Sequence, residues 1–195
     1  MISEIQTDRV LSCESLSCPM PVVKTKQVME DMKPGEVLEV RTTDKGSVAD
    51  LKSWANRVGH QYIGLIEENG VYRHFLRKVS DIESKAEIEY PRQMSNEELE
   101  NKLANGESII VLDVREPAEF ALGHIPNAIN IPLGQLEEKI GQFDLNKVYA
   151  VVCRTGNRSD QACQIMIERG FSNVYNVVPG MSQWQGTTVN GTRGA

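Results

Sequence analysis

The chain is poor in the residue types that build metal sites and disulfide frameworks. It has three histidines and four cysteines among 195 residues. His60, His74 and His124 have no cysteine or carboxylate nearby at ligand spacing, so we expect no metal and no cofactor. Four unevenly spaced cysteines are too few for a disulfide framework, which favours free thiols in a reducing cytoplasm.

The sequence also lacks long apolar runs and an excess of positive charge. No stretch approaches the roughly 18 apolar residues of a membrane span, and residues 1–4 lack the basic and apolar regions of a secretion signal. We therefore expect a cytoplasmic protein without a membrane partner. The net charge of -6 argues against direct binding to nucleic acid.

The first half contains alternating strand and helix signals. Apolar patterns favour strands over residues 9–12 and 36–42, and helices over residues 19–32 and 44–58. Two more strand segments flank Asn69-Gly70, a pair that supplies the positive φ angles of a two-residue hairpin turn. The order βαβαββ predicts a two-layer α+β sandwich in residues 1–79, with two helices on a four-stranded sheet.

Residues 80–92 have the composition of a linker. They alternate in charge, contain a proline and have no wide apolar face. About 14 flexible residues have a typical end-to-end distance of roughly 20 Å and can stretch to about 46 Å. Such a tether would let two surface sites meet.

The second half, residues 93–187, predicts an α/β domain with a central parallel sheet flanked by helices. Ser95 and Glu98 have the spacing of a capping box before a helix. Apolar runs without alternation predict strands that are buried on both faces, at residues 109–114, 128–131, 148–152 and 174–177. Further helices are expected over residues 133–140 and 159–169. The polar, glycine-rich residues 188–195 predict a flexible tail.

Cys153 lies between a predicted strand and a predicted helix, where ligands bind in open α/β sheets. The segment RTGNR can curl into an anion nest of inward backbone N–H groups at a helix N-terminus. Such a nest lowers the pKa of a thiol and stabilises a bound persulfide. Gly156 permits the curl, and Arg154 can attract an anionic donor. Arg158 either attracts the donor as well or braces the loop against a carboxylate such as Asp113. The candidate loop residues are Arg154, Thr155, Gly156, Asn157, Arg158 and Ser159.

Three segments, DVREPAEFALGHIPNAINIP, CRTGNRS and GMSQW, resemble the rhodanese sulfurtransferase family in order and spacing. The resemblance implies that Cys153 takes a sulfane sulfur from a donor such as thiosulfate and carries it as a persulfide. It also implies framework positions for Asp113, Arg115 and His124. Cys163 lies within an apolar helix pattern and is expected in the core.

A phosphatase or arsenate reductase of related fold is the main enzymatic alternative, because it also uses a loop cysteine and a closing arginine. Cys153 and Arg158 are spaced as C-x4-R, one residue shorter than the C-x5-R that is typical of that group. The smaller ring favours a sulfur atom over a tetrahedral oxyanion.

Cys18, in the segment SCPMP, precedes the first predicted helix. Proline is favoured at the first helical position, so Pro19 is expected there, with Cys18 as the N-cap and Pro21 fixing the first turn. The Cys18 sulfur would then face free backbone N–H groups and the positive end of the helix dipole. Both favour the thiolate.

The runs CPMPVVKTKQVM and VADLKSWANRVGH resemble the TusA/SirA-like sulfur-carrier family over nearly all of residues 9–79. The resemblance implies that Cys18 accepts a persulfide and passes it on. Ser12 and Ser15 stand where the family often has aspartate and glycine, which leaves the choice of partner open.

The two halves together predict a sulfurtransferase with two reacting cysteines, Cys153 and Cys18. Cys153 would take sulfur from thiosulfate or a glutathione-type persulfide and relay it to Cys18, or to another thiol or protein acceptor. Two other classes stay open. One is a persulfide carrier or sensor that acts through a protein partner with little turnover. The other is a redox protein in which Cys13 and Cys18 cycle as a disulfide.

Overall fold

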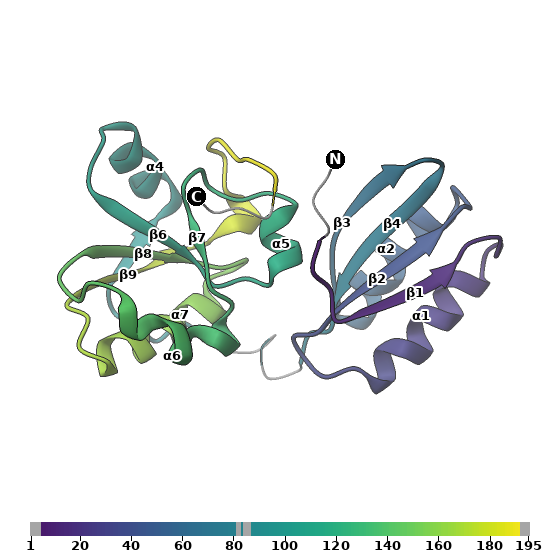
Figure 1. Ribbon diagram of the computed structural model, residues 1–195, viewed down its shortest axis with the longest axis horizontal. Coiled ribbons are helices and arrows are strands. Elements are labelled where there is room, and N and C mark those ends of the chain that lie inside the picture. Colours follow the sequence, from purple (N-terminus) through teal and green to yellow (C-terminus); the bar gives the residue numbers. More distant parts are fainter. Residues whose placement is uncertain (1–4, 81–82, 84–86, 192–195) are drawn as a thin grey trace. The chain divides into compact units, whose positions relative to one another are not determined.

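The computed structural model describes residues 5–80, 83 and 87–191. The chain divides into two compact units, one within residues 4–85 and one within residues 86–195 (Figure 1). Each unit has its own sheet and its own apolar core. No helix in the described part of the chain is long and apolar enough to cross a membrane.

The first unit is a four-stranded sheet with two helices on one face (Figure 1). The sheet has the order β1-β2-β4-β3; β1 runs parallel to β2, and the other neighbours are antiparallel. This arrangement confirms the predicted α+β sandwich. Its elements are β1 (Arg9–Cys13), α1 (Met20–Asp31), β2 (Val37–Thr42), α2 (Ser47–Val58), β3 (Gln61–Glu68) and β4 (Val71–Arg77).

Local sequence explains this unit well. Asn69 and Gly70 have φ angles of 53° and 79°, as the β3–β4 hairpin turn requires. Leu51 and Ala55, one helical turn apart on α2, are fully buried in the same cluster as Leu38 of β2. The apolar period of the sequence therefore selects the helix face that covers the sheet.

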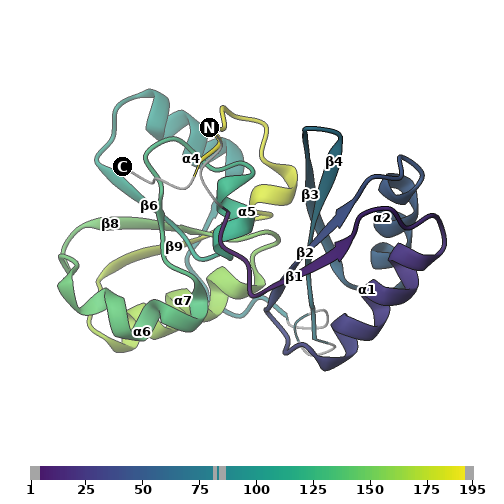
Figure 2. The ribbon, with the colours of Figure 1, turned by 45° about the vertical axis from the view of Figure 1, so that its right-hand side comes forward.

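The second unit is a five-stranded parallel sheet in the order β5-β9-β8-β6-β7. Helices cover both faces (Figure 2), which confirms the predicted α/β architecture. Short 3₁₀ turns flank α6, where one longer helix was expected. The elements are β5 (Gln93–Ser95), α4 (Asn96–Ala104), β6 (Ile109–Asp113), α5 (Pro117–Ala121), β7 (Ile129–Asn130), α6 (Leu136–Lys139), β8 (Val148–Val152), α7 (Asn157–Glu168) and β9 (Asn173–Val178).

The central strands of this sheet are buried on both sides. Leu112 and Val151 belong to one core cluster, whereas Val111 and Ala150 belong to the other. Successive residues of a strand point to opposite faces. A strand that is covered on both faces therefore needs an apolar residue at every position, which accounts for the unalternating runs in the sequence.

The predicted linker is wrong for residues 88–92, which pack on the second unit. Tyr90 is 7% exposed, and its hydroxyl donates to the Val174 carbonyl at 3.0 Å. The backbone N–H groups of Glu89 and Tyr90 donate to Asp160 Oδ1 at 3.1 and 2.7 Å. One large aromatic side chain anchors this charged segment, although the segment has no apolar face. Residues 81, 82 and 84–86 of the predicted linker lie outside the described residues.

The predicted flexible tail is also wrong for residues 189–191. Val189 and His124 exchange two backbone hydrogen bonds, of 3.0 and 2.9 Å, and the Gly191 N–H donates to the Ala121 carbonyl at 2.9 Å. Backbone pairing of this kind does not depend on apolar side chains, so composition did not indicate it. Residues 192–195 lie outside the described residues.

Candidate functional site

The Cys153 loop joins the carboxyl end of β8 to the start of α7. α7 begins at Asn157, two residues earlier than expected, and leaves only three loop residues after the cysteine. Gly156 precedes the helix with a φ angle of 103°. A Cβ atom there would lie 2.7 Å from a Val178 side-chain atom and 2.9 Å from Ile88 Cδ1. Glycine is therefore required both by the backbone conformation and by the packing beneath the loop.

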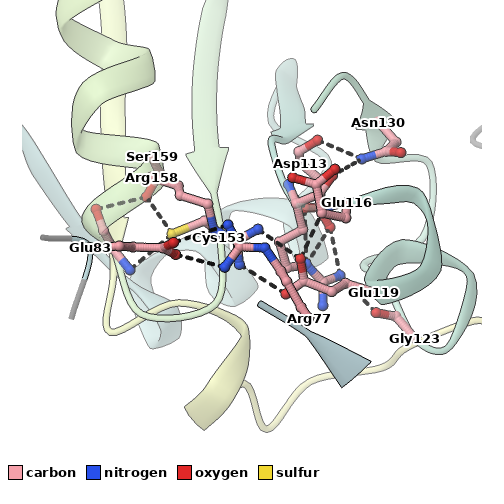
Figure 3. Close-up of polar contacts among 12 residues, drawn as sticks. Arg77, Glu83, Asp113, Glu116, Glu119, Gly123, Asn130, Cys153, Arg158 and Ser159 are labelled. Atoms are coloured by element: carbon pink, nitrogen blue, oxygen red, sulfur yellow. Dashed lines mark hydrogen bonds and ion pairs between the residues drawn. The ribbon is translucent and has the colours of Figure 1, made fainter. Parts of the chain in front are cut away.

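The Cys153 sulfur lies under this loop and is hydrogen-bonded there. The side chain is 1% exposed. The Gly156 N–H donates to Sγ at 3.1 Å, and the Ser159 hydroxyl lies 3.3 Å from Sγ (Figure 3). Ser159 is also 2.6 Å from Asn176 Oδ1, and its single proton serves one acceptor at a time. The Gly156 N–H therefore stabilises negative charge on the sulfur, and the Ser159 hydroxyl does so when its proton turns from Asn176 to Sγ.

The segment after β9 is hydrogen-bonded to the backbone of the Cys153 loop. The carbonyls of Cys153 and Arg154 each accept a backbone N–H at 2.8 Å, from Met181 and Ser182 respectively. A Cβ at Gly180 would lie 2.6 Å from the Cys153 carbonyl oxygen. The GMSQW segment thus fixes the backbone of the reactive loop. No local pattern in the sequence indicated this role.

Arg158 braces the loop, and its partner is Glu119 rather than Asp113. The buried guanidinium donates to both carboxylate oxygens of Glu119, at 2.7 and 2.9 Å (Figure 3). Glu119 also accepts the backbone N–H of Glu116 at 3.0 Å. The prediction that named Asp113 was wrong because Asp113 is held by Arg115 at 2.7 Å. Glu119 stands in the EPAEF segment, where it also forms a capping box with Glu116 at the start of α5.

Asp113, Arg115 and His124 lie in a buried framework beside the loop. Arg115 also donates to the Gly123 carbonyl at 2.8 Å, and the amide of Asn130 donates to the carbonyls of Asp113 and Arg115. His124 stacks on Phe120 with ring centroids 3.6 Å apart. The other predicted loop residues differ in exposure: Arg154 and Thr155 are exposed, and Asn157 is half-buried.

Two further cysteines are buried and hard to ionise. Burial raises the pKa of Cys163 on α7 well above its usual range. Burial also raises the pKa of Cys13 at the end of β1, with a smaller opposing effect from the charge of Lys24. Both thiols belong to apolar core clusters.

Cys18 is exposed in the turn between β1 and α1, one residue further from the helix than predicted. The helix begins at Met20, Pro19 occupies the N-cap, and Pro21 is the second helical residue. The Met20 N–H bonds back to the Ser17 carbonyl at 3.0 Å and closes a turn over the cysteine. Cys18 is therefore not the N-cap, and Pro19 is not the first helical residue.

The Cys18 thiol donates to Asp50 Oδ2 over 2.8 Å. This hydrogen bond is the main cause that raises the pKa of Cys18, and desolvation and the charges of Asp50 and Asp44 add to it. The expectation that this site favours a thiolate was therefore wrong. Because β1 and β2 are parallel, the segments that follow them meet at one edge of the sheet. That pairing brings Asp50 to Cys18. No local pattern in the sequence indicated this contact.

Metal ligation has no support in residues 5–80, 83 and 87–191. Within them no group of three or more histidine, cysteine, aspartate and glutamate side chains could hold an ion.

The family comparisons assign the two folds, each with a cysteine in the turn before a helix, to proteins that carry or transfer sulfur. Residues 9–78 match the family described as "Sulfurtransferase TusA", and residues 95–187 match the family described as "Rhodanese-like domain".

One relative matches across both units. It is a Bacillus subtilis protein named "Putative sulfur carrier protein YrkF", 45% identical over 179 residues, which cover 92% of this chain and 96% of the relative. The chain thus belongs to the family that joins a TusA-type domain to a rhodanese-like domain. This membership gives it a sulfur-carrier and sulfurtransferase function.

Other relatives match one unit only. "Thiosulfate sulfurtransferase GlpE" of Pseudomonas syringae is 36% identical over 78 residues, which cover 40% of this chain and 74% of that protein. A rhodanese-related protein from Thermoplasma volcanium, known from a crystal structure, is 36% identical in sequence. The match covers 50% of this chain and 97% of that chain, with a TM-score of 0.47.

Proposed function

We propose that the rhodanese-like unit loads a sulfane sulfur on Cys153 and that the sulfur passes to Cys18 or to another thiol acceptor. We assign the carrier role to residues 1–79 and the loading role to residues 93–187. The observation that carries this proposal is the pair of donors at Cys153 Sγ, the Gly156 N–H at 3.1 Å and the Ser159 hydroxyl at 3.3 Å.

In the loading step, the Cys153 thiolate attacks the outer sulfur of the donor. A Cys153 S–S bond forms, the S–S bond of the donor breaks, and its electron pair leaves with sulfite or with a small thiolate. The Gly156 N–H stabilises the attacking thiolate, and the Ser159 hydroxyl adds to this when its proton points to Sγ. We propose thiosulfate or a glutathione-type persulfide as donor, since exposed Arg154 would attract either anion.

In the unloading step, an acceptor thiolate attacks the outer sulfur of the Cys153 persulfide and Cys153 leaves as thiolate. The same two donors stabilise this leaving group, which speeds the exchange. The phosphatase alternative has less support, because Arg158 is engaged in a buried ion pair with Glu119 instead of being free to bind an oxyanion.

The burial of Cys153 favours a second candidate function, a persulfide carrier or sensor that acts through a protein partner. A covered sulfur protects its persulfide and slows exchange with bulky acceptors. Incubation with thiosulfate would then release about one equivalent of sulfite without turnover. The Cys13–Cys18 redox cycle lacks such support, because burial raises the pKa of Cys13, opposite to what a resolving thiol requires.

Peptide-level mass spectrometry after exposure of the full chain to thiosulfate tests the relay. We expect added sulfur on Cys153 and on Cys18 in the wild type, and on neither residue in Cys153→Ser. Cys18→Ser should still load Cys153, and Cys163→Ala, which changes a buried core thiol, should load both sites. If Cys153→Ser loads Cys18 at the wild-type rate, the relay is wrong.

We also propose a cytoplasmic location. All four cysteines are free thiols in the structure. Free thiols are typical of a reducing compartment, where persulfide exchange also requires them. Labelling of the free thiols in intact cells and after lysis would test this location.

A further inference from the structure

Asp50 is the one side chain to which the Cys18 thiol is seen to donate in the described part of the chain. The two residues follow the parallel strands β1 and β2, and Sγ lies 2.8 Å from Asp50 Oδ2. Asp50 sits in the first turn of α2. It therefore touches the atom that would carry sulfur in this unit.

The start of α2 is held in place by a buried polar chain. The Ser47 hydroxyl lies 2.6 Å from Thr42 Oγ1, which is 3.0 Å from His74 Nε2, and His74 Nδ1 is 2.9 Å from the Tyr62 hydroxyl. Ser47 also donates to the Asp44 carbonyl. Because these contacts tie the first turn of α2 to the sheet, the backbone from which Asp50 reaches Cys18 is held in place.

The charged groups that act on Cys18 are carboxylates. Asp50 acts through the hydrogen bond and through its charge, and Asp44, just before α2, acts through its charge. On the α1 side, the charge of Lys24 acts on Cys13. The electrostatic environment of the exposed thiol is thus set by the segment that enters α2.

A carboxylate affects the empty and the loaded cysteine in opposite ways. The empty thiol has a proton to donate, and Asp50 accepts it. A persulfide ionises more readily than a thiol, and its outer sulfur lies one S–S bond, roughly 2 Å, beyond Sγ. The loaded, ionised group has no proton for Asp50 and carries a charge of the same sign, so the contact becomes repulsive.

We propose that Asp50 stabilises the empty Cys18 as a hydrogen-bonded thiol and disfavours its loaded, anionic persulfide, so that this domain releases sulfur rather than retaining it. The inference rests on the proposed function, in which Cys18 carries a persulfide. Asp50 does not supply or remove sulfur; it sets the equilibrium between the two states of the carrier.

The exchange that Asp50 biases is balanced without an oxidant. Cys18 loses its proton and forms a bond to the outer sulfur of the donor persulfide, while the donor S–S bond breaks. The electron pair of that bond leaves with the donor thiolate, which takes up a proton. Onward transfer is the same exchange in the opposite direction, with a new thiol as acceptor.

The first experiment measures the ionisation of the empty Cys18, which does not depend on any sulfur transfer. The rate of alkylation of Cys18 by iodoacetamide is followed against pH, by mass spectrometry, in a full-length Cys153→Ser background. We expect Asp50→Asn to shift the profile to lower pH and to raise the rate several-fold near neutral pH. The gain in rate is smaller than the gain in thiolate, because nucleophilicity falls with pKa with a coefficient of about 0.4–0.5. An unchanged profile would overturn the proposal.

Asp44→Asn is the matched control, since it removes one nearby charge that has no hydrogen bond to Cys18. We expect a smaller shift of the profile than in Asp50→Asn. An equal shift would show that the contact is not the cause. Asp50→Glu, which restores the charge on a longer side chain, should return the profile part of the way toward wild type.

The second experiment measures the equilibrium of loading. The same variants, in the same background, are equilibrated with glutathione persulfide and glutathione, and the loaded fraction of Cys18 is counted. We expect Asp50→Asn to raise the ratio of loaded to empty Cys18 several-fold and to slow the onward transfer to a small thiol. An unchanged ratio would overturn the proposal. If Cys18 is never loaded in a chain that keeps both Cys153 and Asp50, the proposed function fails instead, whatever the alkylation profile shows.

Discussion

At the scale of single residues, the buried ion pair between Arg158 and Glu119 has the largest expected effect on the second unit. The two side chains are 6% and 1% exposed. Removal of Glu119 would take two hydrogen bonds of the ion pair from a buried guanidinium, and breaking a buried ion pair costs more than the pair itself contributes. The pair also joins α7, directly after the Cys153 loop, to α5.

Glu119→Gln should therefore destabilise the second unit by about 3–5 kcal/mol and slow the loading of Cys153. The matched control is Glu137→Gln, which breaks the exposed ion pair between Glu137 and Arg169 and should cost about 0–1 kcal/mol. Urea unfolding followed by the fluorescence of Trp184, in a Trp54→Phe background, measures both. Equal losses in the two variants would contradict the proposed bracing role.

The sequence indicated both candidate cysteines, Cys18, which is exposed, and Cys153, which is buried. It did not indicate the side chains that contact Cys18 or brace the Cys153 loop. Cys153 and Cys18 stand in motifs whose glycine and proline residues have local conformational meaning. Glu119 and Asp50 gain their roles from residues 39 and 32 positions away. No local pattern encodes a contact over such a distance, so Asp113 was chosen as the partner of Arg158 where the fold supplies Glu119.

At the scale of elements, the geometry of the Cys153 loop depends on a second loop that follows β9. Gly180 has a φ angle of 78°, and the backbone oxygens of Cys153 and Arg154 lie 2.6 and 3.0 Å from the position of a Cβ atom. Backbone atoms cannot rotate away as a flexible side chain can. A methyl group there would displace the reactive loop.

Gly180→Ala should reduce the rate of persulfide formation on Cys153 by on the order of tenfold or more, because small displacements of reacting groups are costly in catalysis. Gly134→Ala is the control, since Gly134 is exposed and a Cβ there would meet no atom within 4 Å. Single-turnover release of sulfite from thiosulfate measures the step. Equal rates in the two variants would mean that the second loop does not position Cys153.

The elements themselves follow well from the sequence. The Ser95 N-cap with its bond from the Glu98 N–H, the Asn69-Gly70 turn and the doubly buried strands are all present. The errors fall at the ends of elements and between them, as at the start of α1 and at Tyr90. There, a few tertiary contacts outweigh local composition.

At the scale of the whole molecule, each unit has its own core and one of the two tryptophans. Their stabilities can thus be followed separately. In the first unit, burial lowers the pKa of His74 from 6.5 to about 4. The unfolded chain therefore binds a proton that the folded unit excludes, and the stability of this unit falls as the pH drops from about 6.5 to about 4.

His74→Gln should remove most of this pH dependence, which is on the order of 3 kcal/mol for a shift of this size. Burial also lowers the pKa of His60, so His60→Gln is the comparison in the same pH window. Glu39, which pairs with Arg73 and Arg41, has a pKa below 4.5. Its contribution to the stability of the first unit is therefore lost only at a lower pH than this comparison uses. The measurement is the urea midpoint of unfolding at about pH 7 and at about pH 5, followed by the fluorescence of Trp54 in a Trp184→Phe background. The difference between the two midpoints tests the assignment to His74. A His74→Gln variant as pH-dependent as the wild type would contradict this assignment.

Apolar period, turn residues and loop length act over a few neighbouring positions, so the two folds and the two cysteine motifs can be predicted without the structure. The tertiary structure decided how each sulfur is held: Ser159 and Gly156 at Cys153, and Asp50 at Cys18. We expected a thiolate for Cys18 at the helix start. The structure has a hydrogen-bonded thiol there, because the parallel pairing of β1 and β2 brings the carboxylate of Asp50 to Cys18. Protonation depends on the charges that surround an atom in space, and only the fold brings those charges together.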